Sequence, residues 1–297
     1  MEGEPKKEMY DLLPDHLYPP TFTVLPSEPF DLVRQKLLDS GIAFPFIVKP
    51  EIGGQGILLR KINNWNEFEE YHKKNPVEYM VQSFVSYPME VSIFYYRYPG
   101  RLKGTITGFL HKVPLHVTGN GKDTLEELIS RHPKASLRMA ELVSIHGSNF
   151  NKIPEVGEKY MLSYAANHNR GAQFIDLKHE IDDKLITLID TISHKVDDFF
   201  YGRYDIMCSC VEDLKNGLNF TILEYNGCGA EPNHFYDTGY TLLGAYKEIL
   251  KHWKILYEIS RYNKMKGIQY WSFTRGFSFL KATKKHYKII RDADSFV

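Results

Sequence analysis

Two short segments decide the fold: Gly202-Arg203-Tyr204-Asp205-Ile206-Met207 and Leu223-Glu224-Tyr225-Asn226-Gly227. Each places charged or polar residues in a run that otherwise has the apolar pattern of a buried strand. Side chains two residues apart on a strand share a face, so Arg203 pairs with Asp205, and Glu224 pairs with Asn226. The connecting segment ends in an Asn-Gly step, which is a strong hairpin signal. The sequence therefore predicts an antiparallel hairpin that brings Asp205 opposite residues 224–226.

One face of this hairpin would carry two carboxylates, an amide oxygen and a guanidinium. Oxygen ligands of this kind suit a hard divalent cation such as Mg2+, which completes its shell with waters and phosphate oxygens. We therefore expect Asp205, Glu224 and Asn226 to bind Mg2+ beside a nucleotide. Taken singly, each pair is equally well explained by a surface salt bridge or a solvated strand end.

Length and charge set modest limits on the class of protein. At 297 residues the chain can bury a sizeable core and form two domains. Lys plus Arg and Asp plus Glu both number 37, so no net charge favours nucleic acid as a partner. The sequence has no apolar run typical of a membrane helix or a signal peptide, and we expect a cytoplasmic protein.

A second motif joins an apolar strand, residues 44–50, to a glycine-rich turn. Lys49 at the end of this strand would supply a point charge for a phosphate. In the turn, backbone N–H groups can approach an anion closely because glycine has no side chain. The turn consists of Gly53, Gly54, Gln55 and Gly56. It does not match the P-loop pattern, and a plain flexible hairpin explains it as well.

Further elements follow from periodicity and capping. We expect a helix over 64–74 with Asn64 as its cap, and a helix over 181–200. Strands are expected over 78–85 and 87–97. Glu90 interrupts the second of these strands, where it could accept hydrogen bonds from a ribose diol or from nearby backbone.

In this order the motifs resemble the ATP-grasp superfamily of carboxylate-amine ligases, which includes D-alanine-D-alanine ligase and the cyanophycin and glutathione synthetases. The matching segments cover roughly residues 44–228. The resemblance implies an α+β ATP-grasp fold, in which a small lid subdomain and a larger core hold the nucleotide between them. The expected divisions are a leader at 1–20, the lid at 21–89, the core with the metal-binding hairpin at 90–250, and a basic, aromatic helical segment at 251–297.

The resemblance also implies roles for individual residues. Lys49 would bind the α- and β-phosphates, and Arg203 would stabilise developing negative charge, so both are expected catalytic residues. Asp205, Glu224 and Asn226 match the family's magnesium ligands. The other expected nucleotide ligands are Lys7 or its neighbour Lys6, Gly53, Gly54, Gln55, Gly56, Gln82, Ser83, Phe84, Val85, Glu90, Lys112, Asn167 and Arg170. For Asn167 and Arg170, a solvated turn is an equally good interpretation.

The implied activity is ATP- and Mg2+-dependent ligation of a small-molecule carboxylate to an amine through an acyl phosphate. Such chemistry needs mainly positioning, metal ions and cations around the transferring group. Two alternatives stay open: an ATP-grasp phosphotransferase, and a catalytically weak nucleotide-binding or membrane-associated module. Fold resemblance does not choose among them.

Four regions depart from the common pattern or extend it. The resembling ligases carry an additional amino-terminal domain, so the acceptor site is expected to be open, or completed by a partner protein or a homodimer mate. Residues 111–129 look like the strand, turn and helix that cyanophycin and bifunctional glutathione synthetases insert here. The segment after residue 251 could contact an anionic membrane surface peripherally, or pack on the core with solvated lysines. The loop 231–237 is a candidate for substrate contacts.

Overall fold

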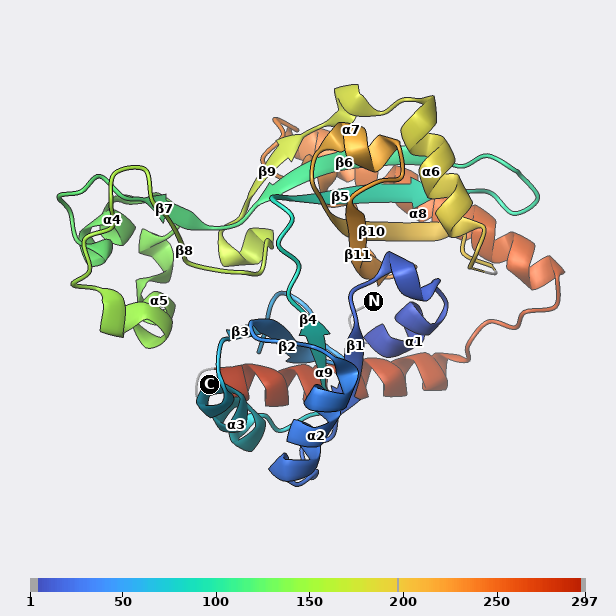
Figure 1. Cartoon of the computed structure of the whole chain (residues 1–297). Helices are drawn as coiled ribbons and strands as arrows, with labels where there is room; N and C mark the ends of the chain where they lie inside the picture. The colour runs from blue at the N-terminus through green and yellow to red at the C-terminus, as the bar shows by residue number, and fades with distance from the viewer. Residues whose placement is uncertain (1–4, 197, 295–297) are drawn as a thin grey trace.

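The computed structural model describes residues 5–196 and 198–294. Within them the architecture is α+β, which confirms the predicted fold class. A four-stranded antiparallel sheet forms a small lobe, a five-stranded antiparallel sheet forms a larger core lobe, and a two-stranded ribbon belongs to a third, projecting lobe (Figure 1). The expected arrangement of a lid and a core is therefore present, with one lobe in addition.

The small lobe is a sheet with two helices packed against it. Its strands run in the order β1-β4-β2-β3, and its bounds are β1 (Thr21–Val24), β2 (Phe46–Pro50), β3 (Arg60–Ile62), β4 (Tyr79–Ser83), α2 (Phe30–Ser40) and α3 (Trp65–Lys74). Val33, Phe46 and Phe68 are fully buried where the helices meet the sheet. As predicted, the Asn64 side chain caps α3 by accepting a hydrogen bond from the backbone N–H of Glu67 at 3.0 Å.

The core lobe is a sheet with strand order β11-β10-β5-β6-β9. Its strands are β5 (Met89–Tyr96), β6 (Thr105–Val113), β9 (Gln173–Asp176), β10 (Tyr201–Cys208) and β11 (Phe220–Asn226). Helix α6 (Asp183–Ser193) buries Leu185 and Ile189 in the same cluster as Tyr204 and Ile206 of β10. The helix is shorter than the predicted range 181–200.

Strands β10 and β11 pair antiparallel, and Asp205 lies opposite Glu224 as predicted. The connection differs from a tight hairpin, because it contains the short helix α7 (Val211–Lys215), which Cys210 caps. Gly217 then reverses the chain with a φ of 71°. The Asn-Gly step therefore ends a helical turn rather than forming a two-residue hairpin loop.

The third lobe interrupts the predicted core range 90–250 and has a hydrophobic core of its own. It consists of β7 (His116–Thr118), β8 (Lys159–Met161), α4 (Leu125–Arg131) and α5 (Met139–His146), and stands to one side of the molecule (Figure 1). Val117, Leu125 and Ile129 belong to its buried cluster. Helix α4 opens with a reciprocal capping box between Thr124 and Glu127. The strand, turn and helix expected over 111–129 are thus present.

Short 3-10 turns connect several of these elements. They are η1 (Asp15–Leu17), η2 (Ser136–Arg138), η3 (Gly147–Asn149), η4 (His168–Arg170), η5 (Lys178–Glu180) and η6 (Asn233–Phe235). The expected leader, residues 1–20, contains α1 (Lys6–Asp11) and η1, and its Leu13 and Leu17 are buried in the core-lobe cluster. The described part of the leader is therefore a component of the core.

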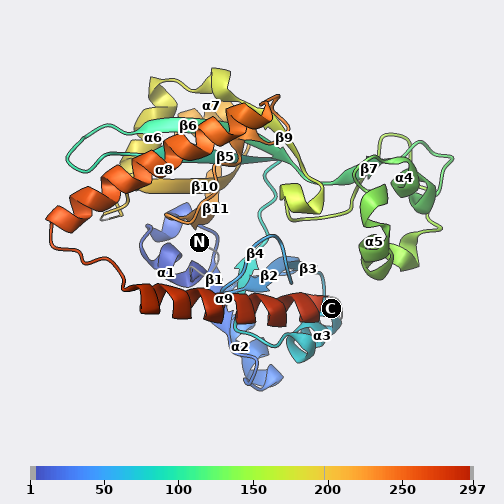
Figure 2. The same ribbon diagram turned by 180° about the vertical axis from the view of Figure 1, so that it is seen from behind.

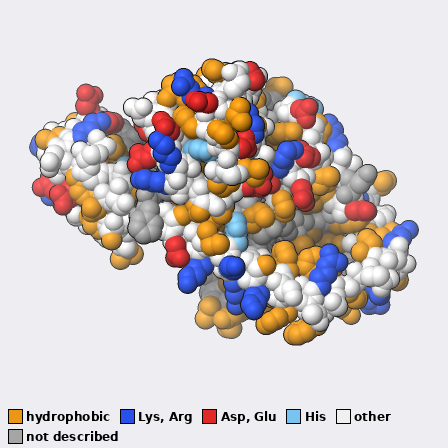
Figure 3. All heavy atoms as spheres, turned by 90° about the horizontal axis from the view of Figure 1, so that it is seen from below, with side chains coloured by type: hydrophobic (Ala, Val, Ile, Leu, Met, Phe, Trp, Pro, Cys, Tyr) orange, Lys and Arg blue, Asp and Glu red, His pale blue; other side chains and the backbone are white. Residues whose placement is uncertain are grey.

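The basic, aromatic segment forms two helices with different destinations. The expected boundary at residue 251 falls inside α8 (Leu242–Met265), which lies across the core sheet, whereas α9 (Phe273–Asp294) runs along the small lobe (Figure 2). Lysine and arginine side chains are interspersed with hydrophobic ones on the face of the molecule seen from below (Figure 3). None of the helices in the described residues has the length and hydropathy needed to cross a membrane.

Helix α9 is fastened to the strand that follows the glycine-rich turn. Ile290 is fully buried in a small cluster with Ile57 and Leu58. The carboxylate of Asp294 accepts a hydrogen bond from the backbone N–H of Leu58 at 2.8 Å and pairs with Arg60 at 3.1 Å. The carboxyl-terminal end of α9 therefore holds residues 57–60, which directly follow the glycine-rich turn.

Replacing Ile290 with Ala should destabilise the protein by about 2–5 kcal/mol, because it leaves a cavity between α9 and the small lobe. The adjacent Ile289 is 40% exposed, and Ile289→Ala should change stability by no more than about 0.5 kcal/mol. Urea denaturation followed by circular dichroism measures both. Equal effects from the two variants would contradict the observed docking of α9.

Candidate functional site

A cavity of about 820 Å³ lies between the small lobe and the core lobe, with the base of the projecting lobe at one side. Most of the residues assigned from the sequence line it. They are Lys49, Gly53, Gly54, Gln55, Gly56, Gln82, Ser83, Phe84, Val85, Glu90, Lys112, Asn167, Arg203, Asp205, Glu224 and Asn226. Lys7 and Arg170 are not among the residues that line the cavity.

Strand alternation explains why the core sheet presents a polar face to this cavity. On β10, Tyr204 and Ile206 point into the hydrophobic core, so Arg203 and Asp205 point the other way. Arg203 lies directly opposite Asn226 across the β10–β11 ladder. The pattern that identified the hairpin in the sequence thus produces a charged surface backed by an apolar one.

Four charged side chains from three adjacent strands form a connected cluster on this face. The Arg203 guanidinium donates to Asp205 Oδ2 at 3.2 Å, and Lys112 Nζ lies 3.6 Å from the same oxygen. Lys112 also donates to Glu90 at 2.5 Å. Asp205 and Lys112 are both nearly fully buried. Buried charges of this kind are stable only as a set, because removing one leaves its partner unpaired in a poorly solvated place.

The two carboxylates of this cluster have pKa values shifted in opposite directions. Burial raises the pKa of Asp205, but the nearby Arg203 and Lys112 outweigh burial and bring the pKa below its ordinary value. For Glu90, burial dominates and raises the pKa, with Lys112 offsetting only part of the effect. Asp205 is therefore the carboxylate that stays charged over the widest pH range.

The site leaves polar atoms buried without partners where a cation would fit. Among the described residues, Asp205 Oδ1 and Asn226 Nδ2 are buried and make no hydrogen bond. An amide flip would turn the Asn226 oxygen to the same place. Glu224 lies opposite Asp205 on the neighbouring strand and also lines the cavity. This donor set consists of oxygens from two carboxylates and one amide, which fits Mg2+.

Lys49 connects the two lobes at the floor of the cavity. Its Nζ donates to Gln82 Oε1 at 3.0 Å, to the Tyr10 hydroxyl at 3.2 Å and to the Leu223 carbonyl at 3.3 Å. Burial lowers the pKa of Lys49, but Tyr10 and Glu224 outweigh burial, so the pKa is raised and the side chain stays charged. Gln82 uses its side-chain amide for Lys49, Tyr10 and Thr21, which the sequence did not indicate.

A β-bulge directs the Leu223 carbonyl to this contact. The pairing passes from Asp205 opposite Glu224 to Ile206 opposite Ile222, which leaves Leu223 as the extra residue. Bulges re-aim backbone groups beside functional sites. Here the re-aimed carbonyl accepts hydrogen bonds from Lys49 and from the Tyr10 hydroxyl.

Of the two leader lysines named from the sequence, Lys6 lines the cavity and Lys7 does not. Lys6 lines the cavity, and its Nζ donates to the Gly53 carbonyl at 2.8 Å. Lys7, the next residue of α1, does not line the cavity, and its Nζ pairs with Asp11 at 2.7 Å on the surface. Burial lowers the pKa of Lys6, and Glu224 opposes that shift.

The glycine-rich turn packs closely against the segment that leaves the projecting lobe. Gly56 has a φ of 70°, and a Cβ at this position would lie 2.5 Å from Ala165 Cβ. Glycine is therefore required at this position for both backbone conformation and space.

Arg170 supports this turn from outside the cavity. Its guanidinium donates to the Gln55 carbonyl at 3.0 Å and to Asp294 at 2.7 Å, and it pairs with Glu141. Its donors therefore serve the turn, α9 and α5. This arrangement differs from the direct nucleotide contact expected from the sequence.

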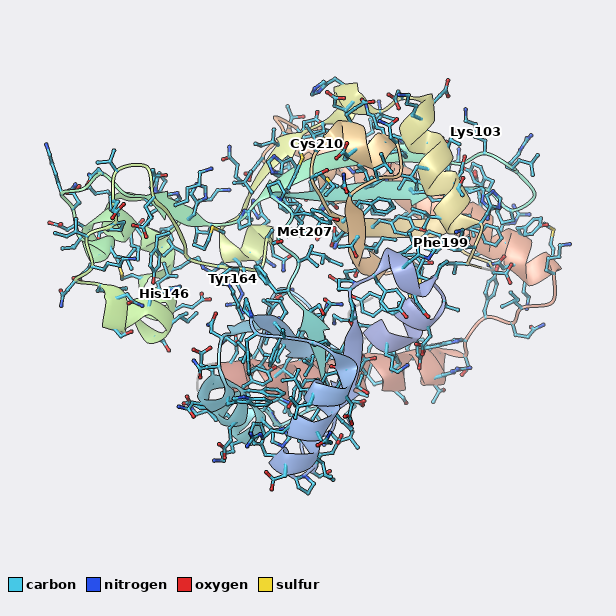
Figure 4. The ribbon with its side chains drawn as sticks, in the orientation of Figure 1. Lys103, His146, Tyr164, Phe199, Met207 and Cys210 are labelled. Carbon is cyan, nitrogen blue, oxygen red and sulfur yellow. The ribbon has the colours of Figure 1, made fainter. Side chains whose placement is uncertain are left out.

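Phe84 and Tyr164 form an aromatic wall on the small-lobe side of the cavity, and the sequence did not predict this contact between them. The rings of Phe84 and Tyr164 meet edge to face at 6.2 Å, and Lys61 lies over both, at 4.4 Å and 5.0 Å from their centroids. Figure 4 shows Tyr164 beside the small lobe and Met207 on the core side. Nothing in the local sequence pattern pairs Phe84 with Tyr164, because they come from different lobes.

Comparisons with known proteins identify similar chains among ligases. The chain is 28% identical over 137 residues to the glutathione biosynthesis bifunctional protein GshAB of Clostridium perfringens, which is 41% of this chain and 18% of that protein. It is 26% identical over 204 residues to cyanophycin synthetase of Trichormus variabilis, covering 62% of this chain and 22% of that one. The chain thus spans about a fifth of the length of the curated relatives it matches.

Solved structures with a related arrangement include D-alanine-D-alanine ligase from Bacillus anthracis, with a TM-score of 0.43 and 14% identity over 86% of this chain and 65% of that chain. The D-cycloserine synthetase DcsG gives a TM-score of 0.44 with 15% identity, covering 84% and 70%. No family model matches the chain. The curated relatives are a glutathione-biosynthesis protein and a cyanophycin synthetase, so the resemblance to these ligases inferred from the motifs is confirmed.

Replacing Lys112 with Met should cost about 3–5 kcal/mol of stability, because Asp205 and Glu90 would remain buried with a cation removed. The exposed, cavity-lining Lys159 is the control, and Lys159→Met should have little effect. Thermal and urea denaturation measure both changes. A Glu90→Gln/Lys112→Met double variant should recover part of the loss, and a double variant no more stable than Lys112→Met would contradict the pairing.

Proposed function

We propose that this chain is an ATP- and Mg2+-dependent ligase that joins a small-molecule carboxylate to an amine through an acyl phosphate. One observation carries the proposal: a buried set of cations and carboxylates surrounds an unpartnered Asp205 oxygen and faces the cavity between the lobes. A volume of about 820 Å³ is within the range of roughly 300–1,000 Å³ typical of small-molecule sites. The similarity to ATP-grasp ligases supports the same reaction class.

The residue types suit activation of a carboxylate by phosphoryl transfer. A carboxylate does not react with an amine at neutral pH, because its oxygen is a poor leaving group. Transfer of the γ-phosphoryl group to that oxygen creates an acyl phosphate, from which the amine displaces phosphate. The protein then has to position the reactants and balance charge, and it needs no nucleophile of its own.

The proposed roles follow from the contacts of each side chain. Lys49 and Lys6 would hold phosphate oxygens, because both are ammonium groups at the floor of the cavity beside Glu224. Arg203 would stabilise the charge that develops on the transferring group. Lys112 would also face phosphate, and the carboxylate of Glu90, which accepts from Lys112, would orient it.

Other groups would enclose the base and the phosphates. The glycine-rich turn would cover the phosphates with its backbone N–H groups. Phe84 and Tyr164 would hold the adenine ring, with the hinge backbone of residues 82–85 alongside. Asp205, Glu224 and Asn226 would bind Mg2+, which supplies neutralisation of phosphate charge.

The carboxylate and amine would bind where the loop after β11 meets the cavity. Glu231, Asn233 and Tyr236 of this loop line the cavity, which fits the expectation that residues 231–237 contact the substrate. The contribution of a homodimer mate, a partner protein or a membrane surface stays a prediction from the sequence.

Turnover can be tested with Mg-ATP and a mixed pool of amino acids and small carboxylates. Wild-type protein should release ADP together with free phosphate, and Asp205→Asn or Glu224→Gln should lower the rate by about a hundredfold or more. Asp213→Asn is the control, because Asp213 lies in α7 away from the cavity. Phosphate retained on the product would instead indicate a phosphotransferase, and full activity of Asp205→Asn would refute the assigned site.

Lys6 and Lys7 form a matched pair for testing the phosphate contact. Lys6→Met should raise the KM for ATP by roughly tenfold to a hundredfold, because it removes a charged hydrogen-bond donor from the cavity. Lys7→Met should leave the KM unchanged, since Lys7 pairs with Asp11 on the surface. Steady-state kinetics at saturating carboxylate and amine distinguish the two. The reverse ranking would show that the leader binds phosphate in another way.

A further inference from the structure

A second cluster of ligand-type side chains lies outside the cavity, between the core sheet and α8. It consists of His234 from η6 together with Glu248 and His252 from α8. Glu248 and His252 are four residues apart, so they share one face of the helix. Both histidines are at least nine-tenths buried, and Glu248 is half-buried. The nitrogen and oxygen atoms offered by the three residues all lie within 4.8 Å of one another.

Two imidazole nitrogens of this cluster lie against one carboxylate oxygen. His234 Nε2 and His252 Nε2 each lie 3.3 Å from Glu248 Oε1. Among the described residues, neither nitrogen makes a hydrogen bond of good geometry, and His234 Nδ1 is likewise buried without one. The two close contacts therefore leave these nitrogens poorly satisfied, although buried polar atoms normally have hydrogen-bond partners.

A separation of 3.3 Å between ligand atoms is typical of residues that bind the same metal ion. Two ligand atoms at the usual zinc distance of about 2.05 Å lie about 3.3 Å apart when the geometry is tetrahedral. At right angles, as in an octahedral site, they would be about 2.9 Å apart. The observed 3.3 Å between each imidazole nitrogen and the carboxylate oxygen agrees with the tetrahedral value.

The surroundings orient one of the two histidines. The other ring nitrogen of His252, Nδ1, is 3.0 Å from the Tyr201 hydroxyl, a partner that can fix the tautomer and leave the Nε2 lone pair free.

We propose that His234, Glu248 and His252 bind one zinc ion, with a water or an added ligand in the fourth position. Two imidazoles and a carboxylate are a known ligand set for zinc, and they differ from the oxygen donors expected to hold Mg2+ in the cavity. The proposal is independent of the ligase reaction.

The zinc would have a structural effect on the cavity. It would tie α8 to η6, whose loop contributes Glu231, Asn233 and Tyr236 to the cavity lining. His234 is already wedged against the sheet, because a Cβ at Gly108 would lie 2.4 Å from its ring. Its ring also contacts that of Phe94 on β5. Figure 2 shows α8 lying across this face of the sheet. The ion would thus fix the position of the loop 231–237 relative to the core sheet.

The test begins with wild-type protein stripped by a chelator and dialysed. Titration with zinc in the presence of excess Mg2+ and a chromophoric competitor should show one tight equivalent, and zinc should raise the melting temperature. Cobalt in place of zinc should give the intense visible absorption of a tetrahedral site. Zinc-edge X-ray absorption on the loaded wild-type protein should show two imidazole ligands, a readout that needs no variant.

Variants locate the ion. His252→Gln and Glu248→Gln should each weaken zinc binding by at least about a hundredfold and abolish the thermal shift. His179→Gln removes an exposed histidine and should bind zinc as the wild type does, and Asp205→Asn should also retain it. Absence of stoichiometric zinc binding by the wild type, or a cobalt spectrum of octahedral type, would overturn the proposal. Unchanged zinc affinity in folded His252→Gln would overturn it as well.

Discussion

The register between β10 and β11 is the constraint on which the site depends. It places Asp205 opposite Glu224 and Arg203 opposite Asn226, and it keeps Tyr204 and Ile206 in the hydrophobic core. A slip of one residue would exchange these two faces, burying the charges among apolar side chains and exposing the aromatic ring to the cavity. The apolar face that packs on α6 therefore enforces the position of every polar group on the opposite face.

The same ladder also joins the two lobes. Its bulge turns the Leu223 carbonyl toward Lys49 of the small lobe and Tyr10 of the leader, so three parts of the chain that are distant in sequence share one hydrogen-bonded node. The carbonyl and the Gln82 amide hold the ammonium group of Lys49 in place before any ligand arrives. Pre-positioned donors of this kind lower the cost of organising a site around an anion.

Much of this arrangement was predictable because it is encoded locally. Strand alternation indicated the polar face of β10, and the capping residue Asn64 marked the start of α3. What could not be predicted depends on tertiary contacts. Whether Lys6 or Lys7 enters the cavity depends on how α1 is rotated, and Arg170 is claimed by Glu141 and Asp294, which are far away in sequence. The contact of His234 with α8 likewise could not be predicted, because it depends on the path that the chain takes after the loop 231–237.

Helices α8 and α9 belong to different lobes, and only residues 266–272 connect them. Fully extended, a segment of this length spans at most about 25 Å, so it would restrict any hinge motion of the small lobe. Arg170 and Asp294 join the far end of α9 to the glycine-rich turn, so in any hinge motion the helix would move with the small lobe. The length of the connecting segment would then limit how far the two lobes could separate.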